Sequence, residues 1–250
     1  MRLLVTNDDG IHAKGIYALA KELEKYHQTI LVAPDDQRSA ASHSITLTRA
    51  LQVKEVVLQG LKSKAFSVDG TPADCVRLAI DQLIEGKIDM VISGINRGFN
   101  LGIDVLYSGT VSAAIEAAIY KIPSIAISMG VTDDLSSYTI AAKYAVKAID
   151  VAKEHNMQND LVLNVNVPLI SESEIKGFKV CRIGDAVYNN YFEEIIPENG
   201  FRLFDIKGNI NEHHIEKTDT QFLNEGYVTI TPLHYDLTNY KIMREVNSWF

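Results

Sequence analysis

The sequence predicts an α/β protein, with a mostly parallel β-sheet covered by helices on both faces and a C-terminal extension of β-hairpins and a helix. Three observations lead to this prediction. Short apolar runs alternate with segments of helical periodicity from Met1 to Pro168, which is typical of parallel strands joined by helices. Aromatic and β-branched residues become frequent after Pro168. The chain has 250 residues and is 46% hydrophobic, which is enough to bury a sizeable core.

The elements between Met1 and Pro168 follow from the spacing of apolar residues. Continuous apolar runs with β-branched residues predict buried strands at residues 2–6, 29–33, 65–68, 90–93, 124–128 and 161–167. Apolar residues three or four positions apart predict helices at residues 14–26, 72–84, 110–120 and 136–154. Thr71 is suited to cap the second of these helices, because Pro72 follows at the first helical position. Residues 45–53 and 54–58 are expected to be extended.

The region after Pro168 has a different pattern, so we expect one unit at 1–168, which holds the active site, and a second at 169–250. Segments 177–183, 186–196 and 200–206 are expected to form antiparallel hairpins, 207–221 a loop, 227–231 a returning strand and 239–250 a helix. Aromatic side chains gather in the hairpins, at Tyr188, Tyr191, Phe192, Phe201 and Phe204. Composition alone does not show whether they pack within one subunit or across an interface.

Composition and motifs exclude several classes of protein. A net charge of −8 disfavours a protein that binds nucleic-acid polymers. Cys75 and Cys181 lie too far apart for a metal motif and indicate reduced thiols. We see no signal peptide and no apolar run long enough to span a membrane, so a cytoplasmic protein without membrane contact is expected. A dinucleotide-dependent oxidoreductase is disfavoured because the GxGxxG fingerprint is absent, and so is the Walker A motif.

Two adjacent carboxylates, Asp8 and Asp9, follow the first predicted strand directly. Two like charges at the end of a buried strand repel each other and are costly to desolvate, and a divalent cation relieves both effects. The alternative is structural: either aspartate could cap the following helix, or Asp9 and Gly10 could form a turn. The pair favours the metal site over the structural interpretation.

Three further segments carry groups that could bind a ligand. The loop at 35–44 contains Ser39 and His43, although such a loop is more commonly only solvated. Residues 94–102 contain Asn96, Asn100 and repeated glycines that allow a ligand close to the backbone. The last segment consists of Ser108, Gly109 and Thr110, which open a helix. A helix N-terminus with hydroxyls suits an anion, although simple capping by Ser108 or Thr110 explains these residues equally well.

The Asp pair, the Ser39 loop and the Asn96 loop all follow carboxyl ends of predicted parallel strands, the edge where open α/β sheets bind ligands. Asp8, Asp9, Ser39 and Asn96 would supply only oxygen ligands. Such a set suits Mg²⁺ or Mn²⁺, whereas zinc prefers histidine and cysteine.

Five segments lie in order between Val5 and Leu233, namely VTNDDGIHAKGI, RSAASHSIT, DGTPADCV, SGINRGFNLGIDVLYSGTVSAA and GYVTITPL. Together they resemble the SurE family of stationary-phase survival proteins, which are metal-dependent 5′/3′-nucleotidases. The resemblance implies a Rossmann-like core and one divalent cation held by Asp8, Asp9, Ser39 and Asn96. It also implies release of phosphate from nucleoside monophosphates, with some members accepting polyphosphate. A C-terminal segment exchanged between subunits of a homodimer or homotetramer is implied as well.

Three residues depart from the pattern of this family. Ser42 stands where glycine is usual, Phe99 where a polar residue is common, and Ala117 where glycine is frequent. None is a proposed metal ligand. Because Phe99 would change the mouth of the site, the departure bears on substrate preference.

The prediction is a metal-dependent phosphomonoesterase that acts on nucleoside 5′- and 3′-monophosphates. Asp8, Asp9 and Asn96 are the expected catalytic residues, with Asp9 as a possible general base. The phosphate is expected to contact a polar set drawn from three segments, Ser39, His43, Asn100, Ser108, Gly109 and Thr110. His43 could instead be a loop histidine bonded to backbone, and Asn100 is included on resemblance alone. The alternative function is a nucleotide-binding sensor that uses the same metal site without hydrolysis.

Overall fold

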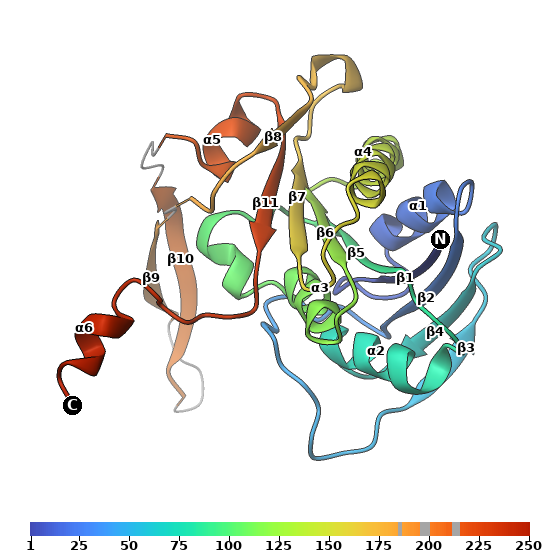
Figure 1. The fold of residues 1–250 in the computed structure, drawn as a ribbon, viewed down its shortest axis with the longest axis horizontal. Helices are drawn as coiled ribbons and strands as arrows, with labels where there is room; N and C mark the ends of the chain where they lie inside the picture. Colours follow the sequence, from blue (N-terminus) through green and yellow to red (C-terminus); the bar gives the residue numbers. More distant parts are fainter. Residues whose placement is uncertain (185–186, 196–200, 212–215) are drawn as a thin grey trace.

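A nine-stranded sheet forms the centre of the protein in the computed structural model (Figure 1). Its strands lie in the order β3-β4-β2-β1-β5-β6-β7-β11-β8. The bounds are β1 Arg2–Thr6, β2 Gln28–Pro34, β3 Val53–Val56, β4 Lys64–Val68, β5 Met90–Arg97, β6 Ser124–Met129, β7 Val162–Val167, β8 Phe178–Val180 and β11 Val228–Leu233. Neighbouring strands are parallel except for the antiparallel pairs β3–β4 and β7–β11. The structure describes residues 1–184, 187–195, 201–211 and 216–250.

Helices cover both faces of this sheet, as predicted. The bounds are α1 Lys14–Leu23, α2 Pro72–Leu78, α3 Gly109–Ile119, α4 Leu135–Glu154, α5 Asp219–Asn224 and α6 Met243–Asn247, with a π-helical turn at Ala79–Leu83 and 3-10 turns at Gly102–Leu106 and Glu172–Glu174. Helices α1 and α4 pack on one face, and α2 and α3 pack on the other (Figure 1). Within the described residues, no helix is both long and apolar enough to cross a membrane.

Strand β1 shows how the sheet divides the core into two layers. Successive side chains of a strand point to opposite faces. Leu3 and Val5 accordingly belong to the core beneath α1 and α4, whereas Leu4 belongs to the core beneath α2. All three are fully buried, which explains why the sequence shows a continuous apolar run here and no alternation.

The strands and helices predicted between Met1 and Pro168 from apolar runs and helical spacing are all present, with ends that differ by a few residues. Thr71 caps α2 in a capping box, accepting a hydrogen bond from the backbone N–H of Asp74 while the Asp74 carboxylate accepts one from Thr71. The helix predicted at 72–84 continues after Leu78 as a π-helical turn. Cys75 and Cys181 are buried and unpaired, as expected.

The prediction of an extended strand over 45–53 was wrong for its first part, because β3 begins only at Val53. The preceding segment bonds to the start of α2 and not to a neighbouring strand. The backbone N–H of Thr46 donates to the Asp74 carboxylate at 3.0 Å, and the Thr71 hydroxyl donates to the carbonyl of Ser44 at 2.7 Å. Side chains thus satisfy the backbone groups that a strand partner would otherwise bind.

Two predictions for the region after Pro168 were also wrong. The segment at 177–183 does not form a hairpin, because β8 joins the central sheet parallel to β11. Residues 207–221 are not all loop, since β10 continues to Asn211 and α5 begins at Asp219. Asp219 is fully buried and accepts hydrogen bonds from the backbone N–H groups of Gly102 and Gly184, at 2.9 and 2.8 Å. The polar composition of this stretch predicted a solvated loop, although Asp219 is a buried residue that joins distant loops.

The predicted hairpin is formed by β9 (Val187–Ile195) and β10 (Leu203–Asn211), which pair antiparallel and extend beyond the central sheet (Figure 1). Its apolar side chains are exposed, with Phe192 at 70% and Ile206 at 62%. The side chain of Tyr188 and residues His213 and His214, which the sequence suggests are part of a solvated loop, lie outside the described residues.

Candidate metal and phosphate site

The predicted functional residues lie at the carboxyl ends of the three adjacent strands β2, β1 and β5. Asp8 and Asp9 follow β1 directly, Asn96 is near the end of β5, and the loop that contains Ser39 follows β2. The backbone N–H of Arg38 donates to the carbonyl of Asp8 at 2.7 Å. The loop after β2 is therefore joined to the aspartate pair one residue before Ser39.

The Asp8 carboxylate meets the N-terminus of α3. The Thr110 hydroxyl donates a hydrogen bond to Asp8 Oδ1. Gly109 allows this close approach, because a Cβ at position 109 would lie 2.8 Å from Asp8 Cβ and 2.9 Å from Asp8 Oδ2. Ser108 caps the helix by accepting a hydrogen bond from the backbone N–H of Val111 at 3.1 Å. The free amides and positive dipole end of α3 thus adjoin the carboxylate pair.

Burial makes the ionised form of this pair costly. Asp8 is 3% exposed, and its loss of hydration raises the pKa of its carboxyl group to about 6. The hydrogen bond from Thr110 opposes this rise, and the charge of Asp9 adds to it. Burial raises the pKa of Asp9 as well, while the backbone N–H of Arg97, which donates to Asp9 Oδ2 at 2.9 Å, lowers it. A positive charge near the two carboxylates would stabilise their ionised forms.

Asn96 and Ser39 offer the other predicted oxygen ligands. The Asn96 side-chain nitrogen donates to the carbonyl of Gly98 at 2.9 Å, which fixes the amide and leaves its oxygen as an acceptor. Ser39 is exposed, and its hydroxyl accepts a hydrogen bond from the Gln37 side chain at 2.8 Å. The side-chain oxygen of Asn7, beside Asp8, is buried without a hydrogen-bond partner in the described part of the chain.

These donors fit a hard divalent cation. The set contains oxygen atoms only, and two of them belong to carboxylates whose ionised forms burial disfavours. The described residues contain no cluster of three or more His, Cys, Asp or Glu side chains that could hold a metal. A site built from two carboxylates, an amide and a hydroxyl therefore suits Mg²⁺ or Mn²⁺ better than zinc.

His43 lies beside a different part of α3. Its Nε2 is 2.6 Å from a carboxylate oxygen of Glu116, and the other oxygen of Glu116 accepts a hydrogen bond from Arg77 at 3.1 Å. Glu116 is six residues beyond Thr110, so about 9 Å of helix separates this group from the Asp8 contact. Glu116 and Arg77 were not predicted as site residues, although an acidic residue in a helix of small and apolar residues indicates a buried polar role.

Asn100 belongs to a buried network of polar side chains. Its side-chain nitrogen donates to the hydroxyl of Ser128 at 2.7 Å, and its backbone N–H donates to the side chain of Asn166 at 2.9 Å. Its carbonyl accepts hydrogen bonds from Asn164 and Asn166. This network fixes the loop after β5 against β6 and β7. The two asparagines of β7 were not predicted, although asparagines within an apolar strand indicate a buried polar role.

His12 comes soon after the aspartate pair in the sequence, but its side chain is exposed. Ser42 has a backbone φ of +52°, a left-handed conformation that favours glycine. Its backbone N–H donates to the carbonyl of Tyr107 at 3.0 Å and its hydroxyl to that of Leu106 at 2.8 Å. The loop that holds Ser39 is thereby tied to the turn before α3.

Comparison with known proteins gives a consistent result along the whole chain. The family model described as Survival protein SurE matches residues 3–190. The chain is 51% identical over 251 residues to "5′-nucleotidase SurE" of Clostridium botulinum (strain ATCC 19397 / Type A), covering 100% of this chain and 99% of the relative. It is 52% identical to "5′-nucleotidase SurE" of Clostridium tetani (strain Massachusetts / E88), covering 100% of both chains.

A solved structure supports the same assignment. The crystal structure of the SurE protein from Aquifex aeolicus superposes with a TM-score of 0.87 at 38% identity, covering 100% of this chain and 99% of the other. The similarity thus extends over the central sheet, the carboxylate edge and the C-terminal region together. The chain belongs to the SurE family.

Proposed function

We propose that this protein is a metal-dependent 5′-nucleotidase that hydrolyses nucleoside 5′-monophosphates to nucleoside and phosphate. We include 3′-monophosphates and short polyphosphate among its substrates. The observation that carries the proposal is the contact between buried Asp8, which adjoins Asp9, and the N-terminus of α3. Carboxylates that can hold a cation thereby adjoin amides that can hold an anion. The full-length relatives that bear the name 5′-nucleotidase support the same reaction.

Asp8, Asp9, Ser39 and Asn96 would hold one Mg²⁺ or Mn²⁺ ion. When bound, such an ion polarises a phosphoryl oxygen and lowers the pKa of water. Asp9 is held by the backbone N–H of Arg97, so a fixed carboxylate oxygen is available to accept a proton from the attacking water.

The start of α3 would bind the phosphate group. Its amides at Gly109 and Thr110 and the Ser108 hydroxyl stabilise negative charge that develops in the transition state. Asn100 is held by Ser128 and β7 and so positions this side of the site. His43, held by Glu116, can supply a proton to the leaving oxygen of a substrate that extends along α3.

The nucleophile is proposed to be water, because the Asp8 carboxylate accepts a hydrogen bond from Thr110 and would also hold the cation. The alternative is a covalent aspartyl-phosphate at Asp8. Hydrolysis of a chiral ¹⁸O-labelled phosphorothioate ester in ¹⁷O-labelled water separates the two. We expect inversion of configuration at phosphorus, which a single displacement by water gives, whereas retention would demonstrate two displacements through Asp8.

Phosphate release from a panel of 5′- and 3′-nucleoside monophosphates tests the proposed reaction. The assay is run with Mg²⁺, with Mn²⁺ and with excess EDTA, beside Asp9→Asn and the matched control Asp133→Asn. Asp133 is an exposed carboxylate at the same sheet edge. We expect metal-dependent release that Asp9→Asn abolishes and Asp133→Asn preserves. No release by folded protein with either metal would contradict the proposal and favour the nucleotide sensor.

The protein is also proposed to associate as a homodimer or homotetramer through residues 169–250, with 1–168 as the unit that contains the active site. Exposed apolar side chains on both faces of the β9–β10 hairpin support this proposal, including Phe192 and Ile206 on one face and Tyr191 on the other. Exchange of this segment between subunits would cover them. A monomeric mass by light scattering at micromolar concentration would contradict it.

A further inference from the structure

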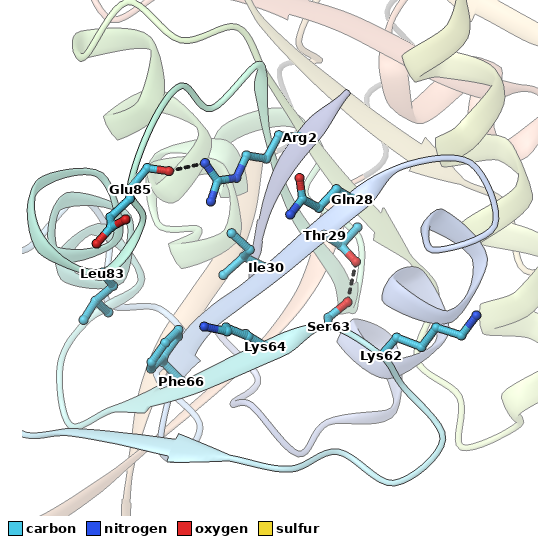
Figure 2. A pocket seen from close by; sticks show the side chains of 10 residues that line it. All are labelled: Arg2, Gln28, Thr29, Ile30, Lys62, Ser63, Lys64, Phe66, Leu83 and Glu85. Atoms are coloured by element: carbon cyan, nitrogen blue, oxygen red, sulfur yellow. Dashed lines mark hydrogen bonds between the residues drawn. The ribbon is translucent and has the colours of Figure 1, made fainter.

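A second cavity lies at the opposite edge of the sheet from Asp8, where β1, β2 and β4 begin (Figure 2). Its volume is about 410 Å³, within the range of small-molecule sites. The charged lining residues are three basic ones and one acidic one, namely Arg2, Lys62, Lys64 and Glu85, and the apolar side chains of Ile30, Phe66 and Leu83 lie beside them. This mixture distinguishes it from the carboxylate site and from the apolar core.

The cavity exists because the helical cover of this face ends early. Strand register pairs Arg2 with Gln28 and Ile30 with Lys64, which places their side chains on the face beneath α2. The π-helical turn after α2 ends at Leu83, and beyond it the backbone carbonyl of Glu85 accepts a hydrogen bond from Arg2. Phe66 and Leu83 are therefore only partly buried at the edge of the core that contains Ile30.

The positive charges of the cavity have no carboxylate partners among the described residues. The Arg2 guanidinium donates to the backbone carbonyl of Glu85 and not to its carboxylate (Figure 2). Arg2 Nε is buried without a hydrogen-bond partner in the described structure. Lys64 makes no ion pair with any described residue. Glu85 is the acidic residue of the lining, so its three basic residues leave a positive balance at this cavity in a chain of net charge −8 and create a local preference for anions.

We propose that this cavity binds a small organic anion, with a phosphate, phosphonate or carboxylate group between Arg2 and Lys64. A planar apolar part of the ligand packs on Ile30, Phe66 and Leu83. Figure 2 shows the Arg2 guanidinium and the Lys64 ammonium group on either side of Ile30, with the Phe66 ring beside the lysine. The charged ends thus flank an apolar floor, which suits a ligand that carries both features.

This site is independent of the proposed nucleotidase reaction. Strand β1 begins at Arg2 and ends at Thr6, so about 13 Å of extended strand, followed by Asn7, separates the cavity from Asp8 and Asp9. Its basic groups need no metal to bind an anion. Binding here is therefore measured without divalent cations, under conditions in which the carboxylate site does not turn over substrate.

Methyl NMR of the full-length protein tests the proposal. The probe is phenylphosphonate in EDTA, because its P–C bond is not a phosphate ester. Inorganic phosphate and benzyl alcohol supply the anion and the ring separately. We expect saturable shifts of the Ile30 and Leu83 methyl signals, with phenylphosphonate binding more tightly than phosphate or benzyl alcohol. Unmoved Ile30 and Leu83 signals, or equal shifts with benzyl alcohol, would overturn the anion site.

A pair of lysine variants makes the test specific. Lys64→Gln is expected to weaken phenylphosphonate binding about tenfold, the effect of losing one charge-assisted hydrogen bond. Lys54→Gln is the matched control, since Lys54 is an exposed lysine on neighbouring β3 that does not line the cavity. Arg2→Gln is expected to reduce the affinity for phenylphosphonate as well, because it removes the other cation proposed to contact the anion. Equal affinity in Lys64→Gln and Lys54→Gln would contradict the proposed contact.

Discussion

The carboxylate edge of the sheet and the β9–β10 hairpin have opposite chemical imbalances. The edge buries Asp8 and partly buries Asp9, and loss of water disfavours the ionised form of each. The hairpin exposes large apolar side chains such as Phe192 and Ile206 to water. Elsewhere, as along β1, apolar residues are fully covered. We infer that stability is sacrificed locally where the proposed binding would restore it, by a cation at the carboxylate edge and by another subunit at the hairpin.

The largest predicted effect concerns the hairpin. Phe192 and Ile206 are cross-strand partners on one face, so Phe192→Ser with Ile206→Ser removes two apolar side chains from each subunit. We expect the association constant to fall at least about a thousandfold, because each buried side chain contributes about 2 kcal/mol. Light scattering at micromolar concentration measures the change in mass. Tyr26→Ser is the control, as Tyr26 is an exposed aromatic residue of the central unit.

A dimer or tetramer that persists in the double variant would break the comparison, because the exposed face of the hairpin would then not be an interface. Dissociation of Tyr26→Ser would have the same consequence.

The next effect concerns the contact between α3 and Asp8. In Gly109→Ala the new methyl group collides with Asp8 Cβ and Oδ2, so the helix start and the carboxylate must separate. A displacement of about 1 Å costs about a hundredfold in kcat. Phosphate release measures kcat, and circular dichroism measures the fold. Gly70→Ala is the matched control, because its methyl group collides at 2.9 Å with Asp74 at the start of α2.

If the two glycine variants lose activity equally, general destabilisation would explain the loss, and the α3–Asp8 contact would have no special role. A selective loss in Gly109→Ala sharpens the assignment of this edge as the active one.

The cost of burying Asp8 can be measured directly. Its folded pKa of about 6 lies above the ordinary value of 3.8, so the folded state binds a proton more tightly than the unfolded state. Without metal, this difference stabilises the protein fully below pH 4, and the contribution is lost as pH rises through 6. The asparagine in Asp8→Asn is not ionised. The free energy of unfolding of this variant should therefore exceed that of wild type by about 2–3 kcal/mol at pH 7.5 in EDTA.

Urea unfolding at pH 4 and at pH 7.5 checks this prediction, and the advantage of Asp8→Asn should nearly vanish at the lower pH. Asp133→Asn provides the control for the loss of one exposed charge. A variant that is less stable than wild type at pH 7.5 would show that Asp8 is not strained by burial.

The smallest effect concerns Ser42, in the loop between β2 and β3. Its φ of +52° costs about 1 kcal/mol for a residue with a side chain. Ser42→Gly removes this cost but loses the exposed hydrogen bond to Leu106, worth about 0.5 kcal/mol. We expect a net gain of about 0.5 kcal/mol in the free energy of unfolding, measured with urea. Ser42→Ala separates the two terms, since it keeps the strained backbone and should be less stable than wild type.

The candidate site was largely predictable because it depends on sheet topology. In a parallel sheet the carboxyl ends of neighbouring strands meet at one edge, so Asp8, Asp9 and Asn96 could be brought together from strand positions alone. The roles of other residues could not be predicted in this way. The bond between His43 and Glu116 joins a loop to a helix 73 residues later, and no local pattern specifies that pairing.

The C-terminal region was predicted less well for a related physical reason. Strand β8 was expected in a hairpin, because its short apolar pattern resembles that of its neighbours in sequence. Strand β8 ends at Val180, whereas its partner β11 begins only at Val228, with β9, β10 and α5 between them in the chain. Backbone hydrogen bonds between such distant segments depend on how the whole sheet packs.

The amino-acid sequence was sufficient to predict the strands and helices between Met1 and Pro168, the alternation that requires a parallel sheet, and the edge at which Asp8 and Asp9 lie. These features depend on local periodicity and on the shared direction of parallel strands. The folded structure was needed to find the place of β8 and β11, the network around Asn100 and the cavity between Arg2 and Lys64. Those features depend on packing between residues far apart in the chain. Side-chain fit and the point at which a covering helix ends determine which of these residues come into contact.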